Sequence, residues 1–245
     1  MEIKKSFMVS LMFSDKFECP SCRGHDVAGD TFTCAECGYG FGAGKVSLSP
    51  STGERIFNHP KLYEAKVKFL GALNRFPRYF FNDALVGKDV LDLGCGAWQY
   101  LYDPNVTRFR VGMDIAPEAV LRSNQLYPSS IHIVRSISEP LPFKDKSFDV
   151  CVLSFVLHHL ERSNWEAVLA EASRVSRSSI IIADHICNTS RFKRFIQMLW
   201  WKDVDGGRYY AVRKEWEELL RPLGKTSVVQ TGTLFGNMGI FSVRL

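Results

Sequence analysis

Four of the seven cysteines stand in two close pairs near the start of the chain. Cys19 and Cys22 form the first pair, Cys34 and Cys37 form the second, and eleven residues lie between the pairs. Two thiolates two residues apart can hold one metal ion from a tight turn, and a second pair completes a tetrahedral site. The spacing predicts a structural Zn2+ site with four protein ligands and no place for a reactive water. Two unrelated pairs or a redox dithiol are the alternatives, although redox motifs usually come as one pair.

A second set of reactive side chains lies later in the chain, where His158 and His159 are adjacent and Asp184 precedes His185. Both sets follow apolar runs, so we expect them at the ends of buried strands. An imidazole or carboxylate placed there can take a proton from a bound nucleophile. The alternatives are that the histidine pair closes a loop and caps the next helix, and that Asp184 and His185 position a substrate.

The elements that must hold these residues are short apolar strands that alternate with helical patterns. This alternation predicts an α/β fold with a parallel sheet covered on both faces, which binds ligands beyond the carboxyl ends of its strands. At the end of the chain, 225–231 and 239–245 read as an antiparallel edge hairpin. The predicted strands are 89–93, 110–113, 131–134, 148–154 and 180–183, and the predicted helices are 60–76, 117–125 and 164–175.

The stretch Val90-Leu-Asp-Leu-Gly-Cys-Gly96 resembles motif I of the class I S-adenosylmethionine-dependent methyltransferases. Asp114 follows Asp92 by 22 residues, and the segments 140–149 and 156–160 then come in the order of the small-molecule and quinone subgroup often called type 11. The resemblance covers about residues 85–185. It implies a Rossmann-like, mostly parallel sheet and methyl transfer from S-adenosylmethionine.

The resemblance also implies a cofactor site, residue by residue. Two glycines allow close approach of the backbone to a ligand, and an acidic residue at the end of the second strand can accept both hydroxyls of a ribose. The residues carried over are Asp92 near the methionine amino group, Gly94, Cys95 and Gly96 in the turn along the methionine and ribose, Asp114 on the ribose, Ile115 on the adenine, and Ser154, Phe155 and Val156 at the floor.

Two positions depart from that pattern. Trp98 stands where a third glycine is common, and Ile137 stands where an acidic residue often touches the adenine amine. Ser136, Ser138 or a backbone group can take over that second role. A nicotinamide dinucleotide is disfavoured, because its fingerprint asks for a third glycine at Gln99.

Residues 190–216 are predicted to cap the acceptor site. Phe192, Phe195, Ile196, Leu199 and Trp200 recur at helical spacing among Arg and Lys, which suits a hydrophobic or lipid-like acceptor with an anionic group. The alternative is an amphipathic helix whose aromatic side chains pack onto the sheet. Together these patterns predict a zinc-ribbon module over 1–50 and a methyltransferase domain over 51–245.

Composition excludes several classes of protein. The chain has 31 Lys and Arg against 26 Asp and Glu, and 46% of its residues are hydrophobic. These values exclude a disordered or collagen-like chain, and the net charge of +5 is too small for a dedicated nucleic-acid binder. No apolar run is long enough to cross a membrane. Four paired cysteines and three scattered ones do not resemble a secreted disulfide framework, and no small-residue cleavage site follows the N-terminal apolar patch, so we expect a cytoplasmic protein.

Three functions remain, and the oligomeric state is open. The first is a methyltransferase that acts on O, N or C of a small or amphiphilic acceptor. The second is an RNA methyltransferase similar to the bacterial rRNA guanine-N1 enzymes, whose knuckle usually has His where this chain has Cys37. The third is a non-catalytic adaptor that keeps the fold. This function is suggested by Trp98 and Ile137, which depart from the cofactor-binding pattern.

Overall fold

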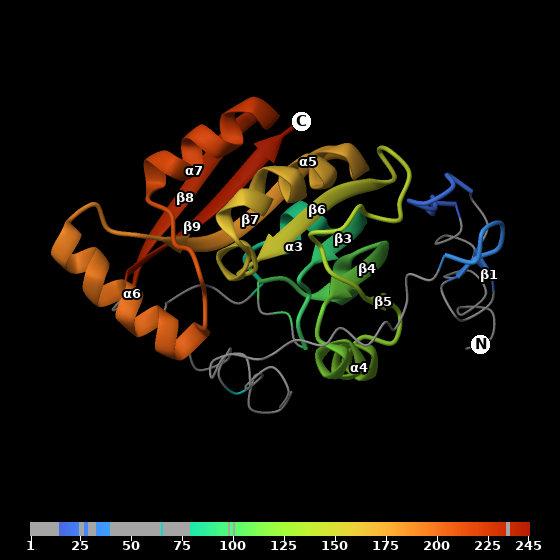
Figure 1. Cartoon of the computed structure of the whole chain (residues 1–245), viewed down its shortest axis with the longest axis horizontal. Helices are drawn as coiled ribbons and strands as arrows, with labels where there is room; N and C mark the ends of the chain where they lie inside the picture. Colours follow the sequence, from blue (N-terminus) through green and yellow to red (C-terminus); the bar gives the residue numbers. More distant parts are fainter. Residues whose placement is uncertain are drawn as a thin grey trace.

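The computed structural model describes residues 15–24, 27–28, 33–39, 65, 79–97, 99, 101–233 and 236–245. Its centre is a seven-stranded sheet with the strand order β5-β4-β3-β6-β7-β9-β8 (Figure 1). Parallel pairing joins β5, β4, β3, β6 and β7, whereas β9 runs antiparallel between β7 and β8. The strands are β3 (Asp89–Leu93), β4 (Phe109–Asp114), β5 (Ile131–Val134), β6 (Phe148–Ser154), β7 (Ser176–Ile186), β8 (Lys225–Thr233) and β9 (Gly236–Arg244). The predicted mostly parallel sheet with an antiparallel C-terminal hairpin is confirmed.

Strand β3 shows why this sheet is buried on both faces. Successive side chains of a strand point to opposite faces. Leu91 and Leu93 therefore join the main core with α5 (Trp165–Val175) and α7 (Arg213–Leu220), while Val90 joins a second core with α3 (Asn82–Leu85). Helix α4 (Pro117–Leu126) begins at a proline, as predicted, and lies beside β4 and β5 (Figure 1).

Some elements differ from their predicted bounds. Strand β7 begins at Ser176, four residues before the predicted start, because its polar first residues pair with the beginning of β6 and with the last residue of β9. Helices α3 and α7 were not predicted, whereas α6 (Arg191–Asp205) matches the predicted helical spacing. Of the predicted helix 60–76, Ala65 is helical and the remaining positions lie outside the described residues. The 3-10 turns are η3 (Pro104–Val106), η4 (Leu157–His159), η5 (Arg162–Asn164) and η6 (Arg221–Leu223).

The cysteine-bearing segment, residues 15–24, 27–28 and 33–39, packs directly against the sheet domain. Its strands β1 (Val27–Ala28) and β2 (Thr33–Cys34) pair antiparallel. Phe17 forms a bridge with Phe143 and is completely buried in the main core. Backbone hydrogen bonds from Glu18 N to Pro142 O (3.2 Å) and from Lys144 N to Lys16 O (2.8 Å) extend this contact. The predicted boundary at residue 50 lies outside the described residues.

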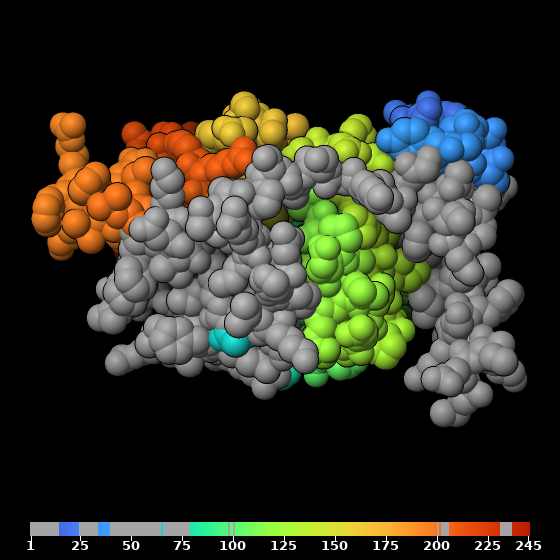
Figure 2. All heavy atoms as spheres, turned by 60° about the horizontal axis from the view of Figure 1, so that its bottom comes forward, coloured from blue at the N-terminus to red at the C-terminus, as the bar shows by residue number. Residues whose placement is uncertain are grey.

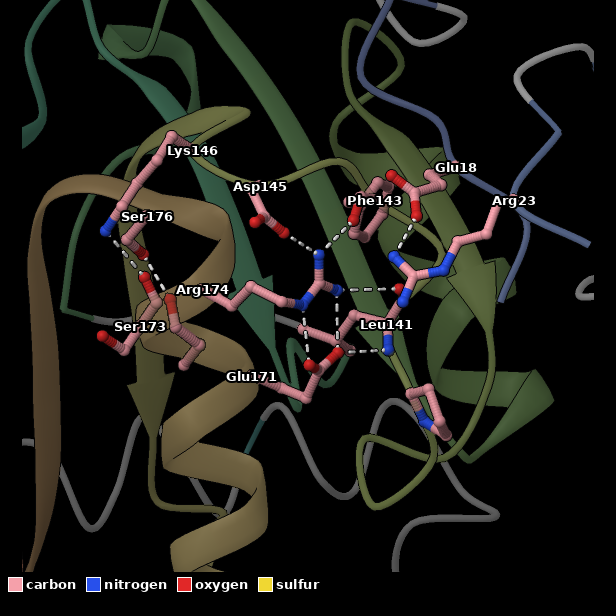
Figure 3. Close-up of polar contacts among 12 residues, drawn as sticks. Glu18, Arg23, Leu141, Phe143, Asp145, Lys146, Glu171, Ser173, Arg174 and Ser176 are labelled. Carbon is pink, nitrogen blue, oxygen red and sulfur yellow. Dashed lines mark hydrogen bonds and ion pairs between the residues drawn. The ribbon is translucent and has the colours of Figure 1, made fainter. Parts of the chain in front are cut away.

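Arg174 on α5 holds the loop that receives this segment (Figure 3). Its guanidinium donates to the carbonyls of Phe143 (2.7 Å) and Leu141 (3.2 Å) and also pairs with Glu171 and Asp145. Glu171 in turn accepts from Leu141 N at 2.9 Å. Loop 141–146 is thereby fixed between α5 and the cysteine-bearing segment.

A buried ion pair ties the same segment to the first strand of the sheet. Lys16 Nζ lies 2.6 Å from Asp89 Oδ2 and donates to Ser147 O at 2.7 Å. Arg108 pairs with the other oxygen of Asp89 at 2.7 Å. Burial acts to raise the pKa of Asp89, but Arg108 and Lys16 outweigh it and hold this pKa below its ordinary value. Within the described residues, no helix has both the length and the apolar character needed to span a membrane.

Candidate functional site

The turn after β3 is shaped by two glycines in the left-handed region. Gly94 has φ +73° and Gly96 has φ +58°. A Cβ at Gly94 would collide with the side chain of Val156, which follows β6. The turns after β3 and β6 therefore approach each other at the carboxyl edge of the sheet, and only glycine allows this approach.

Asp114, at the end of β4, faces that turn. One of its oxygens accepts from Gly96 N (2.8 Å) and the other accepts from Ala116 N (2.9 Å). Burial raises the pKa of the Asp114 carboxyl, and the two N–H donors offset only part of the effect. Each carboxylate oxygen can accept a second hydrogen bond. Asp114 therefore keeps acceptor capacity for a diol, and half-buried Ile115 follows it directly.

Asp92 belongs to a buried polar network that the sequence did not reveal. Its Oδ2 accepts from Arg110 Nη2 (2.7 Å), Tyr102 OH (2.7 Å) and Gln99 Nε2 (3.1 Å). Its Oδ1 is buried and has no hydrogen-bond partner among the described residues. Only Oδ1 is therefore left for the predicted contact with a cofactor amine. Arg110, a charged residue at the start of the apolar strand β4, was the sequence signal of this network.

Cys95 packs beside this network, next to Gly112 and His132. A Cβ on Gly112 would lie 2.9 Å from Cys95 Sγ and 2.9 Å from the ring of His132, so this glycine makes room for both. His132 accepts from Arg110 Nη1 (2.9 Å). Burial, and then Arg110, lower the pKa of His132 to about 3, so the ring is neutral. Burial also raises the pKa of Cys95 well above its ordinary value. Cys95 packs as a neutral thiol beneath the turn.

Ser154, the last residue of β6, and Phe155, which follows it, lie at the same edge of the sheet. Ser154 is half-buried, and its Oγ has no hydrogen-bond partner among the described residues. Phe155 has φ +53° and donates its N–H to Ala183 O at 2.7 Å, which fixes this unusual backbone against β7. The orphan oxygens of Ser154 and Asp92 are groups that a polar ligand at the edge can satisfy.

His158 and Asp184 meet across the ends of β6 and β7. His158 Nδ1 lies 2.7 Å from Asp184 Oδ1, and both side chains are almost fully buried. The same carboxylate oxygen accepts from His185 N at 2.7 Å. Burial acts to raise the pKa of Asp184, but the neighbouring histidines outweigh it and hold this pKa below its ordinary value. Asp184 is therefore an ionised anchor for His158.

Aromatic rings surround this pair. The His158 ring centroid lies 4.1 Å from that of half-buried His159 and 5.4 Å from that of Tyr210, on which it stacks. His185 lies 4.3 Å from Trp201 and 5.4 Å from Phe155. The structure thus brings all four predicted acid–base residues into one cluster, to which Trp201 of α6 is an addition that sequence reasoning missed.

Several side chains of the predicted cap are not part of the cluster around His158 and His185. Phe192 and Phe195 are exposed on α6, and Trp216 is buried in the main core between Trp165 and Phe241.

The residues predicted near the adenine lie apart from the cap. Ser138 is exposed, and Ser136 Oγ accepts the N–H of Ser138 at 3.2 Å. Ile137 faces the core, because an apolar side chain gains more from burial there. Trp98 lies outside the described residues.

The four cysteines of the predicted metal site do come together. The Sγ atoms of Cys19, Cys22, Cys34 and Cys37 all lie within 4.8 Å of one another. Backbone N–H groups of Ser21 and Gly24 donate to Cys19 Sγ and Cys22 Sγ, each at 3.4 Å. A closed set of four sulfur ligands fits a tetrahedral zinc ion.

Comparison with known proteins bears on the sheet domain. A family model described as a methyltransferase domain matches residues 91–182. An uncharacterized methyltransferase from Synechocystis is 32% identical over 137 residues, which are 52% of this chain and 63% of that protein. The chain thus spans less than two thirds of this curated relative.

Solved structures share the fold. A possible histamine N-methyltransferase from Thermotoga maritima superposes with a TM-score of 0.58 at 16% identity, covering 78% of this chain and 96% of that one. The DhpI–SAH complex gives a TM-score of 0.59 at 14% identity, with 78% and 94% covered. These matches show the same arrangement of sheet and helices as in this chain.

Proposed function

We propose that the protein transfers a methyl group from S-adenosylmethionine to a small or amphiphilic acceptor, and this proposal is supported by the match of residues 91–182 to a family model described as a methyltransferase domain. The observation that carries the proposal is Asp114, held beside the Gly94–Gly96 turn with acceptor capacity left for a diol. Asp114 would hold the ribose, and the orphan oxygens of Asp92 and Ser154 would meet the polar methionine end. The bound cofactor supplies an electrophilic methyl group, and the protein aligns the acceptor with it and excludes water.

The acceptor would lie against the cluster at the ends of β6 and β7. His159 and His185 are only half-buried, so we assign to them the contact with an acceptor that has a proton to lose. The buried pair of His158 and Asp184 would position them. This role for His158 is supported by its carbonyl oxygen, which accepts from Arg208 N (2.7 Å) and Tyr209 N (3.1 Å) and so fastens the cap to η4.

An RNA acceptor gains no support from the described part of the cysteine-bearing segment. Arg23, its outermost cation, is paired with Glu18 at 2.6 Å. A surface that holds RNA needs several unneutralised cations to bind phosphates. We therefore keep the small or amphiphilic acceptor as the proposed substrate class.

Titration calorimetry with S-adenosylmethionine tests the cofactor proposal. Asp114→Ala removes the diol acceptor, and we expect the cofactor to bind at least about tenfold more weakly, since a hydrogen bond to a charged group contributes about 1.5–3 kcal/mol. Glu118→Gln is the matched control, because it removes an exposed carboxylate at the start of α4. Equal affinities for the wild type and Asp114→Ala, or no binding to the wild type, contradict the proposal.

We also propose that the four cysteines hold one structural Zn2+ ion. Metal analysis of the purified protein should give one zinc per chain, and Cys34→Ser should abolish it, because the lost ligand opens a closed tetrahedral site. Cys187→Ser is the control, since this buried thiol lies at the end of β7, away from the cluster. A chain with no zinc, or zinc retained by Cys34→Ser, refutes the assignment.

A further inference from the structure

Helix α6 carries an apolar stripe that faces solvent. Successive helical residues turn by about 100°, so positions i, i+3, i+4 and i+7 fall on one side. On this side the exposed fractions are 74% for Phe192, 59% for Phe195, 50% for Ile196 and 50% for Leu199. We call these four residues the α6 stripe. Soluble monomers rarely expose four large apolar side chains together, and such a patch marks an interaction surface.

The opposite side of α6 holds the helix on the domain. Trp201 is buried, with its ring centroid 4.3 Å from that of His185 and 4.9 Å from that of Tyr210. Gln197 Oε1 accepts from Asn188 N at 2.8 Å. The stripe is therefore not needed to pack α6. Helix α6 lies at the end of the molecule remote from the cysteine-bearing segment (Figures 1 and 2).

Cations border the stripe on both sides. Arg191 and Lys193 precede and follow Phe192, so each is turned by about 100° from it in opposite directions, and both are exposed. Helix α6 contains the cations Arg191, Lys193, Arg194 and Lys202, against Asp203 and Asp205 at its C-terminal end. An apolar face with positive flanks matches a surface that is apolar inside and negatively charged at its rim.

We propose that the α6 stripe docks on an anionic lipid bilayer. The four apolar side chains would enter the boundary between head groups and acyl chains, and the flanking cations would meet the lipid phosphates. Because Trp201 ties the inner side of α6 to the His185 cluster, docking would bring the acceptor end of the sheet to the membrane. The further conclusion that the acceptor is a membrane amphiphile rests on the proposed function, whereas docking itself does not.

Vesicle flotation of the full chain tests this proposal. We expect the protein to float with vesicles of phosphatidylcholine and phosphatidylglycerol in equal parts, and to bind pure phosphatidylcholine about tenfold more weakly. Phe192→Ser with Phe195→Ser should lower binding to the mixed vesicles at least about tenfold, because two aromatic side chains that would enter the bilayer are lost. Arg191→Gln with Lys193→Gln should lower it about tenfold and reduce its salt dependence.

Leu121→Ser is the matched control. Leu121 is 61% exposed on α4, outside the stripe, so its replacement should leave flotation unchanged. Failure of the wild type to float, or equal flotation of the Phe192→Ser/Phe195→Ser variant, overturns the proposal. The proposal is also overturned if the wild type is a dimer in the absence of vesicles and the Phe192→Ser/Phe195→Ser variant is a monomer, because a second copy of the chain would then cover the stripe. Calorimetry with S-adenosylmethionine on the same variant tests the proposed function separately, since cofactor affinity should stay within about twofold.

Discussion

At the scale of the residue, Asp184 combines burial with charge. It is almost fully buried, yet it accepts hydrogen bonds from His158 Nδ1 and His185 N on the same oxygen. A buried carboxylate is tolerated only where such donors and nearby cationic groups compensate for its lost hydration. The pair therefore orders the ends of β6 and β7, on which the proposed acceptor site depends.

The Asp184→Asn variant should show this role in its stability. Because the pKa of Asp184 is lowered in the folded state, its ionised form stabilises the fold above the ordinary value of 3.8, and this contribution disappears as the pH falls below that value. We expect the free energy of unfolding at neutral pH to fall by about 1–2 kcal/mol. The difference from the wild type should shrink on acidification, in urea titrations across the pH range.

Asp145→Asn is the control for that experiment. Asp145 also pairs with a cation, Arg174, but its side chain is 72% exposed, so the loss should be about 0.5 kcal/mol or less. A pH-independent difference between the wild type and Asp184→Asn would show that shape rather than charge matters at this position.

At the scale of the element, the turn after β3 depends on the conformational freedom of glycine and on contact with the turn after β6. Gly87 and Gly94 have similar positive φ values, +66° and +73°. A Cβ at Gly87 would meet no other heavy atom within 4 Å, whereas one at Gly94 would collide with Val156. Backbone strain and side-chain collision can therefore be separated by experiment.

Gly94→Ala and Gly87→Ala form that matched pair. Gly87→Ala should cost about 1 kcal/mol of unfolding free energy, from the left-handed backbone alone. Gly94→Ala should cost about 1–3 kcal/mol more, because Val156 must move, and it should also weaken cofactor binding. Urea denaturation and calorimetry measure the two effects. Equal losses of unfolding free energy for the two variants would mean that Val156 and the turn after β6 move aside without destabilising the fold.

At the scale of the whole molecule, the cysteine-bearing segment and the sheet domain share one core. Phe17, Cys19 and Cys34 are buried in the same cluster as the strands, and Lys16 pairs with Asp89 of β3. Loop 141–146, held by Arg174, provides the surface between them. We therefore expect metal binding and folding of the sheet to be coupled.

Phe17→Ala tests this coupling. Removal of a fully buried phenylalanine should cost about 3–5 kcal/mol of unfolding free energy, and the chain should still unfold in one transition with an unchanged m value. Phe192→Ala is the control, since a side chain that is 74% exposed should contribute about 0.5 kcal/mol or less. Two separate transitions, one removed by a zinc chelator, would show instead that the segment folds independently.

Local pattern was enough for much of this protein. Apolar runs placed the strands, a proline placed the start of α4, and the spacing of the cysteines predicted a four-sulfur cluster, because each feature depends on neighbours in the chain. Asp92, the glycines after β3 and Asp114 at the end of β4 likewise predicted where a cofactor would bind, since parallel strands bring their carboxyl ends to one edge of the sheet.

The tertiary structure decided what faces what. Three contacts join residues that are distant in sequence: Asp92 with Arg110, Gly94 with Val156, and His158 with Asp184. The periodicity of a single helix or strand cannot predict such contacts. The same holds for α6. Its sequence shows two apolar sides, and only packing against His185 and Tyr210 selects Trp201 for burial and leaves Phe192 and Phe195 in solvent.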